Sequence, residues 1–186
     1  MSEISSLKYW QLRFFSKPKC DRKIFKIIAK NRYRSILELG IRNVETTKNV
    51  ISVAKKFGLG GSLKYTGVDL FEGRQESDEK LSLKFVHQQL NPLNVKLQLV
   101  PGDPLQALNR IANSHIRTDL IIISEMCDQE ALEQAWFYVP RMLHATSTVL
   151  IQPEEAQIDE FTSISRLQIE RKAELETDRR RNTRAA

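Results

Sequence analysis

Acidic side chains stand at the ends of three successive apolar segments of this sequence. Glu38 lies in "SILELG", Asp69 ends "YTGVD", and Asp103 follows "LVPG". A carboxylate accepts hydrogen bonds from hydroxyl and amine groups, and it attracts positive charge. These positions favour a site for a polar ligand that carries hydroxyls, an amine and a positive charge.

The elements that must hold these side chains follow from the hydrophobic pattern. Short apolar segments, typical of strands buried on both faces, alternate with segments whose apolar residues recur at helical spacing. The expected strands are 35–39, 64–71, 95–100, 119–124 and 147–152, and the expected helices are 45–57, 77–90 with Ser77 as its cap, 104–113 and 130–143. This alternation predicts an α/β fold: a doubly wound, mostly parallel, Rossmann-like sheet of about five strands in the order 3-2-1-4-5, flanked by helices.

In a sheet of this kind, ligands bind at the carboxyl ends of the strands. We expect that edge to gather Glu38, Gly40, Asp69, Asp103 and Ser124, with Glu125 beside them. Carboxylates there disfavour NAD, whose pyrophosphate needs backbone amides. S-adenosylmethionine carries hydroxyls, an exocyclic amine and a positive charge, so it is the expected cofactor.

The chain divides into three expected parts. Residues 1–20 are a basic N-terminal helical extension, in which Leu7, Trp10 and Phe14 fall at helical spacing. Residues 21–153 form the α/β domain, and residues 154–186 form a polar helical segment that ends in a basic, frayed tail. No strand pattern is visible after residue 153.

The segment "ILELGIRNVETT" resembles the first motif of class I methyltransferases, in a branch whose loop reads ELGxRxGxST. Glu38, Leu39, Gly40, Arg42 and Thr47 match that pattern, and Thr46 stands in place of the serine. The resemblance implies methyl transfer from S-adenosylmethionine to a small-molecule acceptor. It places Glu38 and Gly40 against the methionine part of the cofactor, Asp69 on the ribose hydroxyls, Asp103 at the adenine amine and Leu70 on the adenine ring. Arg42 and Ser124 are also expected to bind the cofactor.

Two stretches depart from that family. Val44 replaces the loop glycine, and a β-branched residue disfavours positive φ, so we expect a rearranged turn. The stretch "ISEMCDQE" stands where the branch has "IDGDHSYE", so the resemblance implies no catalytic base. A domain that keeps the fold without catalysis, as a binding or assembly module, is therefore a second interpretation.

Each candidate also has a purely structural interpretation. Glu38 could cap a helix or pair with Arg42, Asp69 could be a turn residue, and Asp103 before Pro104 could cap a helix. Cys127 is expected to be a packed thiol rather than a nucleophile, because no histidine is near it in sequence.

The charge pattern bears on possible partners. Residues 1–35 hold ten Lys and Arg against two acids, and residues 166–186 hold seven against four, whereas the part between them is acidic. Nucleic acid is therefore not an expected partner, and weak association with it through the basic ends is a third interpretation. No apolar run is long enough for a membrane span or signal peptide, so we expect a cytoplasmic protein with no membrane partner. The two cysteines have no metal-binding spacing, and no metal is expected.

An expected homodimer follows from the last strand and the N-terminal aromatics. Without a strand after residue 153, the segment 147–152 would be an exposed sheet edge, which proteins rarely leave bare. Trp10, Phe14 and Phe15 would also be costly to leave in water. A symmetric dimer would cover both, whereas terminal helices acting as lids are the alternative.

Overall fold

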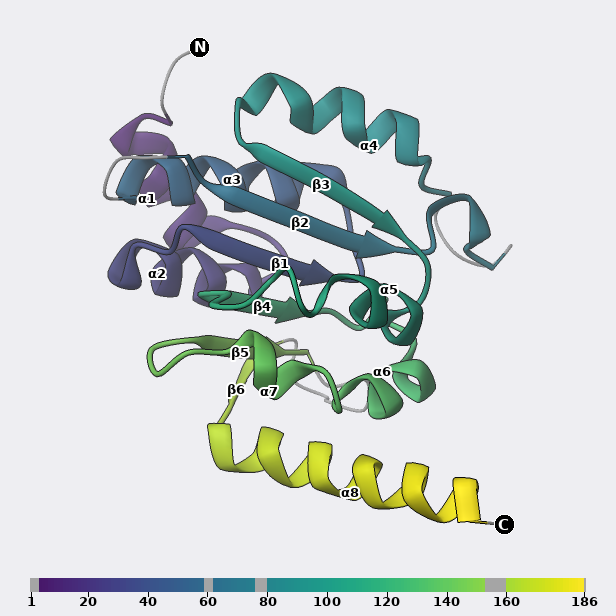
Figure 1. Ribbon diagram of the computed structural model, residues 1–186. Coiled ribbons are helices and arrows are strands. Elements are labelled where there is room, and N and C mark those ends of the chain that lie inside the picture. Colours follow the sequence, from purple (N-terminus) through teal and green to yellow (C-terminus); the bar gives the residue numbers. More distant parts are fainter. Residues whose placement is uncertain (1–3, 59–61, 76–79, 153–159, 186) are drawn as a thin grey trace.

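The computed structural model describes residues 4–58, 62–75, 80–152 and 160–185. One sheet in the order β3-β2-β1-β4-β5-β6 forms the centre of the molecule (Figure 1). The strands are β1 Ser35–Leu39, β2 Lys64–Asp69, β3 Lys96–Pro101, β4 Leu120–Ile123, β5 Thr148–Ile151 and β6 Thr162–Ile164. The first five are parallel and β6 is antiparallel to β5, so the expected doubly wound architecture and strand order are confirmed.

Helices cover both faces of the sheet (Figure 1). On one face lie α1 Ser6–Phe15, α2 Asp21–Asn31, α3 Val44–Phe57 and α4 Leu83–Leu90, and on the other lie α5 Pro104–Ile111, α6 Gln129–Ala135, α7 Val139–Met142 and α8 Arg166–Ala185. Two short 3-10 turns, η1 Phe71–Gly73 and η2 Asn91–Leu93, follow β2 and α4. The central strand β4 is apolar throughout because both of its faces are covered, and all four of its residues are buried; the edge strand β3 is largely exposed.

The sixth strand corrects the expectation that the sheet ends at residue 152. Val149 is paired with Ile164 and Ile151 with Thr162, so β6 covers the edge of β5 within the chain. Little in the sequence indicates this strand, because it is only three residues long and shows no alternation of apolar and polar residues over a longer segment. An uncovered edge of β5 is therefore no longer a reason to expect a homodimer. The exposed aromatic residues of the N-terminal helix are the remaining reason.

Both terminal segments pack onto the α/β domain. Tyr9 of α1 makes an edge-on ring contact with Phe57 of α3, with ring centroids 4.6 Å apart. At the other end, Phe161 and Ile169 are buried in the two cores that lie on opposite faces of the sheet. Tyr9 and Ile169 thus attach the two terminal helices to the domain.

Two expected helices have different bounds in the structure. The segment 130–143 forms α6 and α7 with a turn between them, because Pro140 lacks an amide proton and its ring excludes a continuous helix before it. The helix expected from residue 77 begins only at Leu83, and residues 80–82 are not helical. Ser77, the expected cap, lies outside the described residues.

Within the part of the chain that the structure describes, no helix combines the length and the apolar character required to cross a bilayer.

Candidate functional site

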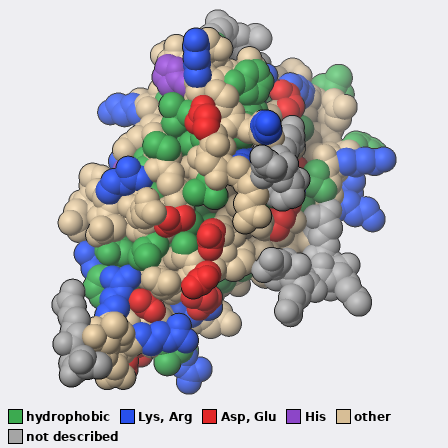
Figure 2. Space-filling view, turned by 90° about the vertical axis from the view of Figure 1, so that its right-hand side faces the viewer, with side chains coloured by type: hydrophobic (Ala, Val, Ile, Leu, Met, Phe, Trp, Pro, Cys, Tyr) green, Lys and Arg blue, Asp and Glu red, His purple; other side chains and the backbone are tan. Residues whose placement is uncertain are grey.

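A cavity opens at the carboxyl ends of β1, β2 and β3 and beside the loop after β4. Figure 2 faces this edge of the sheet and shows acidic side chains gathered across it. Four of the expected site residues line the cavity, namely Gly40, Asp69, Leu70 and Asp103. The other lining residues are Val68, Arg74, Gly102, Pro104, Met126, Cys127 and Asp128.

Asp69, the carboxylate expected to bind a ribose, already has four hydrogen-bond donors. The backbone amides of Ile41 and Phe71 each donate to it at 2.8 Å. The guanidinium of Arg74 donates to both carboxylate oxygens, from Nε at 2.8 Å and from the second amino group at 2.6 Å. Both side chains are almost fully buried, so this is a charge-assisted pair shielded from water.

Arg74 is also part of the cavity wall. It donates a further hydrogen bond to the carbonyl of Ile41, which ties it to the loop after β1. The remaining cavity has a volume of about 30 Å³, the share of one water molecule. Pockets for cofactor-sized ligands have volumes of roughly 300–1,000 Å³. Arg74 therefore occupies the place where a ligand of Asp69 would lie.

Gly40 is needed because the loop after β4 approaches it closely. It has a φ of +77°, and a Cβ there would lie 2.6 Å from Ser124 Oγ and 2.8 Å from the amide of Cys127. Ser124 donates a 2.7 Å hydrogen bond to the carbonyl of Gly40. The backbone space at this glycine is thus filled by the chain itself, and Ser124 joins two loops rather than lining the cavity.

Asp103 both caps a helix and lines the cavity. Its carboxylate accepts a 2.9 Å hydrogen bond from the amide of Gln106, so it caps α5, and Pro104 follows as the first helical residue. The same residue lines the cavity beside Leu70, which is partly exposed there.

Glu38 lies beneath the cavity in a buried polar cluster. Tyr65 donates to its carboxylate at 2.6 Å and Thr47 at 3.1 Å. Burial raises the pKa of Glu38 to about 7, although these two hydrogen bonds and the charge of Arg42 act against that rise. The structure therefore separates Glu38 from the cavity and gives it partners between β1, β2 and α3.

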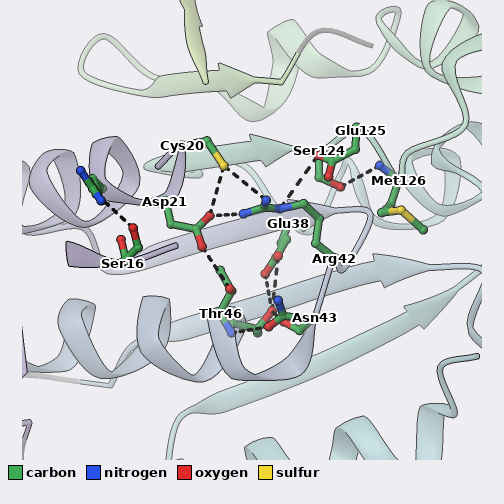
Figure 3. Close-up of polar contacts among 12 residues, drawn as sticks. Ser16, Cys20, Asp21, Glu38, Arg42, Asn43, Thr46, Ser124, Glu125 and Met126 are labelled. Atoms are coloured by element: carbon green, nitrogen blue, oxygen red, sulfur yellow. Dashed lines mark hydrogen bonds and ion pairs between the residues drawn. The ribbon is translucent and has the colours of Figure 1, made fainter. Parts of the chain in front are cut away.

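Arg42 points away from the cavity and toward the start of α2 (Figure 3). It forms an ion pair with Asp21 and donates a hydrogen bond to Cys20 Sγ at 3.3 Å. Its guanidinium also lies 4.0 Å from Glu125 and 5.6 Å from the ring centroid of Phe161. Arg42 thus connects α2, the loop after β4 and the segment before β6.

The turn after β1 is closed by a helix cap rather than by a second glycine. The side chain of Asn43 accepts a 2.7 Å hydrogen bond from the amide of Thr46, and Val44 is the first residue of α3 (Figure 3). Val44 packs against the core and has a negative φ, so the replacement of the family's glycine introduces no strain.

The residues around the cavity include no activated nucleophile. Burial raises the pKa of the Cys127 thiol to about 12, and nearby Asp128 adds to that rise, so the reactive thiolate is disfavoured. His115 is buried and lies 2.9 Å from Thr66 Oγ1, and His144 is paired with Asp119 at the opposite edge of the sheet. Among the described residues, no group of three His, Cys, Asp or Glu side chains is placed to hold a metal ion.

Sequence reasoning missed Arg74 and Tyr65. Arg74 follows η1 in a segment with no hydrophobic period, so nothing in its neighbourhood pointed toward Asp69. Tyr65 lies on β2 opposite Ile36 of β1, and the parallel register could have placed its hydroxyl near Glu38. The contact between Tyr65 and Glu38 can be predicted only when the pairing of β1 and β2 is known.

Comparisons with known proteins give a likeness of structure alone. A scan against protein-family models and a search of curated proteins find no match. The apo structure of CalS11, a TDP-rhamnose 3'-O-methyltransferase of calicheamicin biosynthesis, has a TM-score of 0.58 at 14% identity and covers 84% of this chain and 74% of its own. An O-methyltransferase from Bacillus cereus in complex with SAH has a TM-score of 0.54 at 15% identity, with 91% and 76% covered. The chain has a class I methyltransferase fold.

A third structure, cofactor-bound Rv0187 from MTB, has a TM-score of 0.51 at 14% identity. The match covers 78% of this chain but only 62% of that one, so this chain spans less than two thirds of that protein.

Proposed function

We propose that this chain binds S-adenosylmethionine at the carboxyl edge of its sheet and transfers the methyl group to a small-molecule acceptor. The observation that carries the proposal is the convergence of Gly40, Asp69, Leu70 and Asp103 on one cavity, although they follow three different strands. Neighbours in structure include proteins whose names describe O-methyltransferases and a complex with SAH.

In this proposal the residue chemistry suits the cofactor once Arg74 moves. Asp69 would accept hydrogen bonds from the two ribose hydroxyls in place of those from Arg74, and it would keep those from the amides of Ile41 and Phe71. Asp103 would face the adenine amine, and Leu70 would pack on the adenine ring. The bound cofactor would supply an electrophilic methyl group, and the chain's residues would orient it; orientation is the main requirement of methyl transfer.

Closure by Arg74 lowers the expected affinity. A ligand that binds only the open state has its apparent affinity reduced by the fraction of molecules in that state. Since the closed state has a buried charge-assisted pair, the open state is the minor one.

A second candidate is a non-catalytic module with the same fold. The pairing of Arg74 with Asp69 favours this candidate, because Arg74 donates the hydrogen bonds that ribose hydroxyls would otherwise donate to the carboxylate of Asp69. The lack of an activated base or nucleophile among the described cavity residues agrees with this candidate as well.

Calorimetric titration with S-adenosylhomocysteine tests both candidates. The variants are Arg74→Gln, which removes the guanidinium from the cavity, and Asp69→Asn, which removes the carboxylate; Arg166→Gln is the matched control, because Arg166 forms an exposed pair with Glu170 on α8, outside the cavity lining. We expect Arg74→Gln to bind at least roughly tenfold more tightly than the wild type, and Asp69→Asn to lose binding.

The outcomes separate the candidates. Binding by the wild type together with methyl transfer to an added acceptor supports the enzyme. Binding that appears only in Arg74→Gln supports a closed, non-catalytic site. No heat with the wild type or with Arg74→Gln at millimolar ligand would overturn cofactor binding.

A further inference from the structure

The outer face of α1 carries an exposed cluster of large apolar side chains. Leu7 is 81% exposed, Trp10 56% and Phe15 75%, and Phe14 is also exposed. We call these four residues the α1 patch. Soluble proteins leave such residues exposed singly, whereas their grouping on one short helix marks a surface that contacts something apolar.

The helix that bears the patch is fixed to the domain by its opposite side. Tyr9 packs on Phe57, and Leu12 is partly buried against the same core. Lys56 Nζ donates a 3.0 Å hydrogen bond to the carbonyl of Ile4, and Ser5 caps the helix by accepting from the amide of Lys8 at 3.1 Å. The apolar residues of the α1 patch are therefore surplus to those that attach the helix.

The charge around the α1 patch has one sign. Residues 4–20 contain Lys8, Arg13, Lys17 and Lys19 and no acidic residue. The guanidinium of Arg13 lies 5.1 Å from the ring centroid of Phe14, at the border of the patch. A partner of this surface must therefore be apolar at its centre and negatively charged around it.

We propose that the α1 patch docks on the surface of an anionic lipid bilayer. A helix that lies in the interface has Leu, Trp and Phe on its buried face and Lys or Arg beside them, and this composition matches α1. Tryptophan favours the level of the lipid headgroups, and each basic residue near an anionic surface adds attraction. Docking of this kind requires no membrane-spanning helix, and the proposal replaces the expectation, drawn from the lack of a long apolar run, that the protein has no membrane partner.

Other occupants fit the patch less well. A symmetric second copy would bring two basic helices together, and the like charges would repel. Single-stranded nucleic acid requires open aromatic faces for base stacking. Here Trp10 and Phe14 stack on each other, with centroids 4.9 Å apart and planes at 20°, and Leu7 offers no ring.

Tryptophan fluorescence of the full chain gives a direct test. The chain has two tryptophans; Trp10 is exposed and Trp136 is fully buried, so a blue shift on adding vesicles reports Trp10. With vesicles of phosphatidylglycerol and phosphatidylcholine in equal parts, we expect a blue shift and sedimentation with the vesicles. Both should weaken at high salt and be absent with phosphatidylcholine alone.

Two variants and one control locate the contact. Trp10→Ser/Phe14→Ser should reduce vesicle partitioning at least roughly tenfold, and Lys17→Gln/Lys19→Gln should reduce it on anionic vesicles. Leu167→Ser removes a similarly exposed apolar residue of α8 and should leave partitioning unchanged. Circular dichroism checks that each variant is folded.

Three results would overturn the proposal. The first is the absence of sedimentation and of a blue shift with anionic vesicles. The second is a dimer without lipid that Trp10→Ser/Phe14→Ser converts to monomer, which would assign the patch to a second copy. The third is binding of polyuridylate, lost in that variant, without binding to vesicles.

Discussion

The hydroxyl of Tyr65 donates a 2.6 Å hydrogen bond to Glu38 between two neighbouring strands of the sheet. Both side chains are buried; ionised Glu38 raises the cost of ionising Tyr65, whereas the hydrogen bond from Tyr65 favours ionised Glu38 and only partly offsets the effect of burial. Burial and the nearby Glu38 raise the pKa of Tyr65 well above its ordinary value, and burial raises the pKa of Glu38 to about 7. Folding therefore favours neutral Tyr65 and shifts Glu38 toward its protonated form.

Glu38 should make the stability of the fold depend on pH. Its pKa is about 7 in the folded chain against 4.5 as the ordinary value, so folding takes up a proton between these limits. The stabilisation is complete below about pH 4.5 and is lost as pH rises through about 7. The change amounts to roughly 3 kcal/mol.

Urea unfolding of wild type and Glu38→Gln across this pH range measures the effect. Glutamine keeps the size and the acceptor oxygen but does not titrate, so the stability of the wild type relative to the variant should fall as pH rises. A difference between the two proteins that stays constant with pH would contradict the assignment.

The Asp69–Arg74 pair should show the behaviour of a buried ion pair. Arg74→Gln or Asp69→Asn alone leaves one buried charge without its opposite, and each should cost about 3–5 kcal/mol of unfolding free energy. The double variant should recover most of that loss, because no unpaired charge remains. Additive losses in a double-mutant cycle would show that the two side chains are not coupled.

Arg42 should be a structural residue that lysine cannot replace. Its planar guanidinium contacts Asp21 and Cys20 together, and a lysine ammonium lacks that fork. We expect Arg42→Lys to lower the unfolding free energy by about 2 kcal/mol and to leave S-adenosylhomocysteine affinity unchanged. Arg166→Lys, in an exposed pair with Glu170, is the control and should change stability by less than about 0.5 kcal/mol. Loss of cofactor affinity in folded Arg42→Lys would instead show that Arg42 contributes to cofactor binding.

The central sheet was predictable because its signals are local. Five of its strands are short, apolar-rich segments separated by segments of helical period, and right-handed crossovers then allow few strand orders. By contrast, β6 has only "TSI" as its own sequence, and it forms because β5 offers an unpaired edge. Such a strand is specified by tertiary pairing rather than by its residues.

The sequence predicts which residues lie at the cavity, but it does not predict which side chains they contact. The strand-end rule placed Gly40, Asp69, Leu70 and Asp103 around one cavity. It could not foresee that Arg74 would fill that cavity, since the pairing depends on the path of the chain after η1. The missing glycine at Val44 predicts a rearranged turn. Asn43, a residue type that often caps helices, instead indicates that a helix begins at Val44, and the structure has this cap.

The strand that covers the edge of β5 is made after β5 itself during synthesis of the chain. A ribosome releases the chain from its amino end, so β5 emerges before the strand that pairs with its open edge. Until about residue 164 is free, the nascent domain presents bare amide and carbonyl groups that other nascent chains can pair with. The edge of β5 is therefore open to pairing with other chains in the interval between the synthesis of β5 and that of β6.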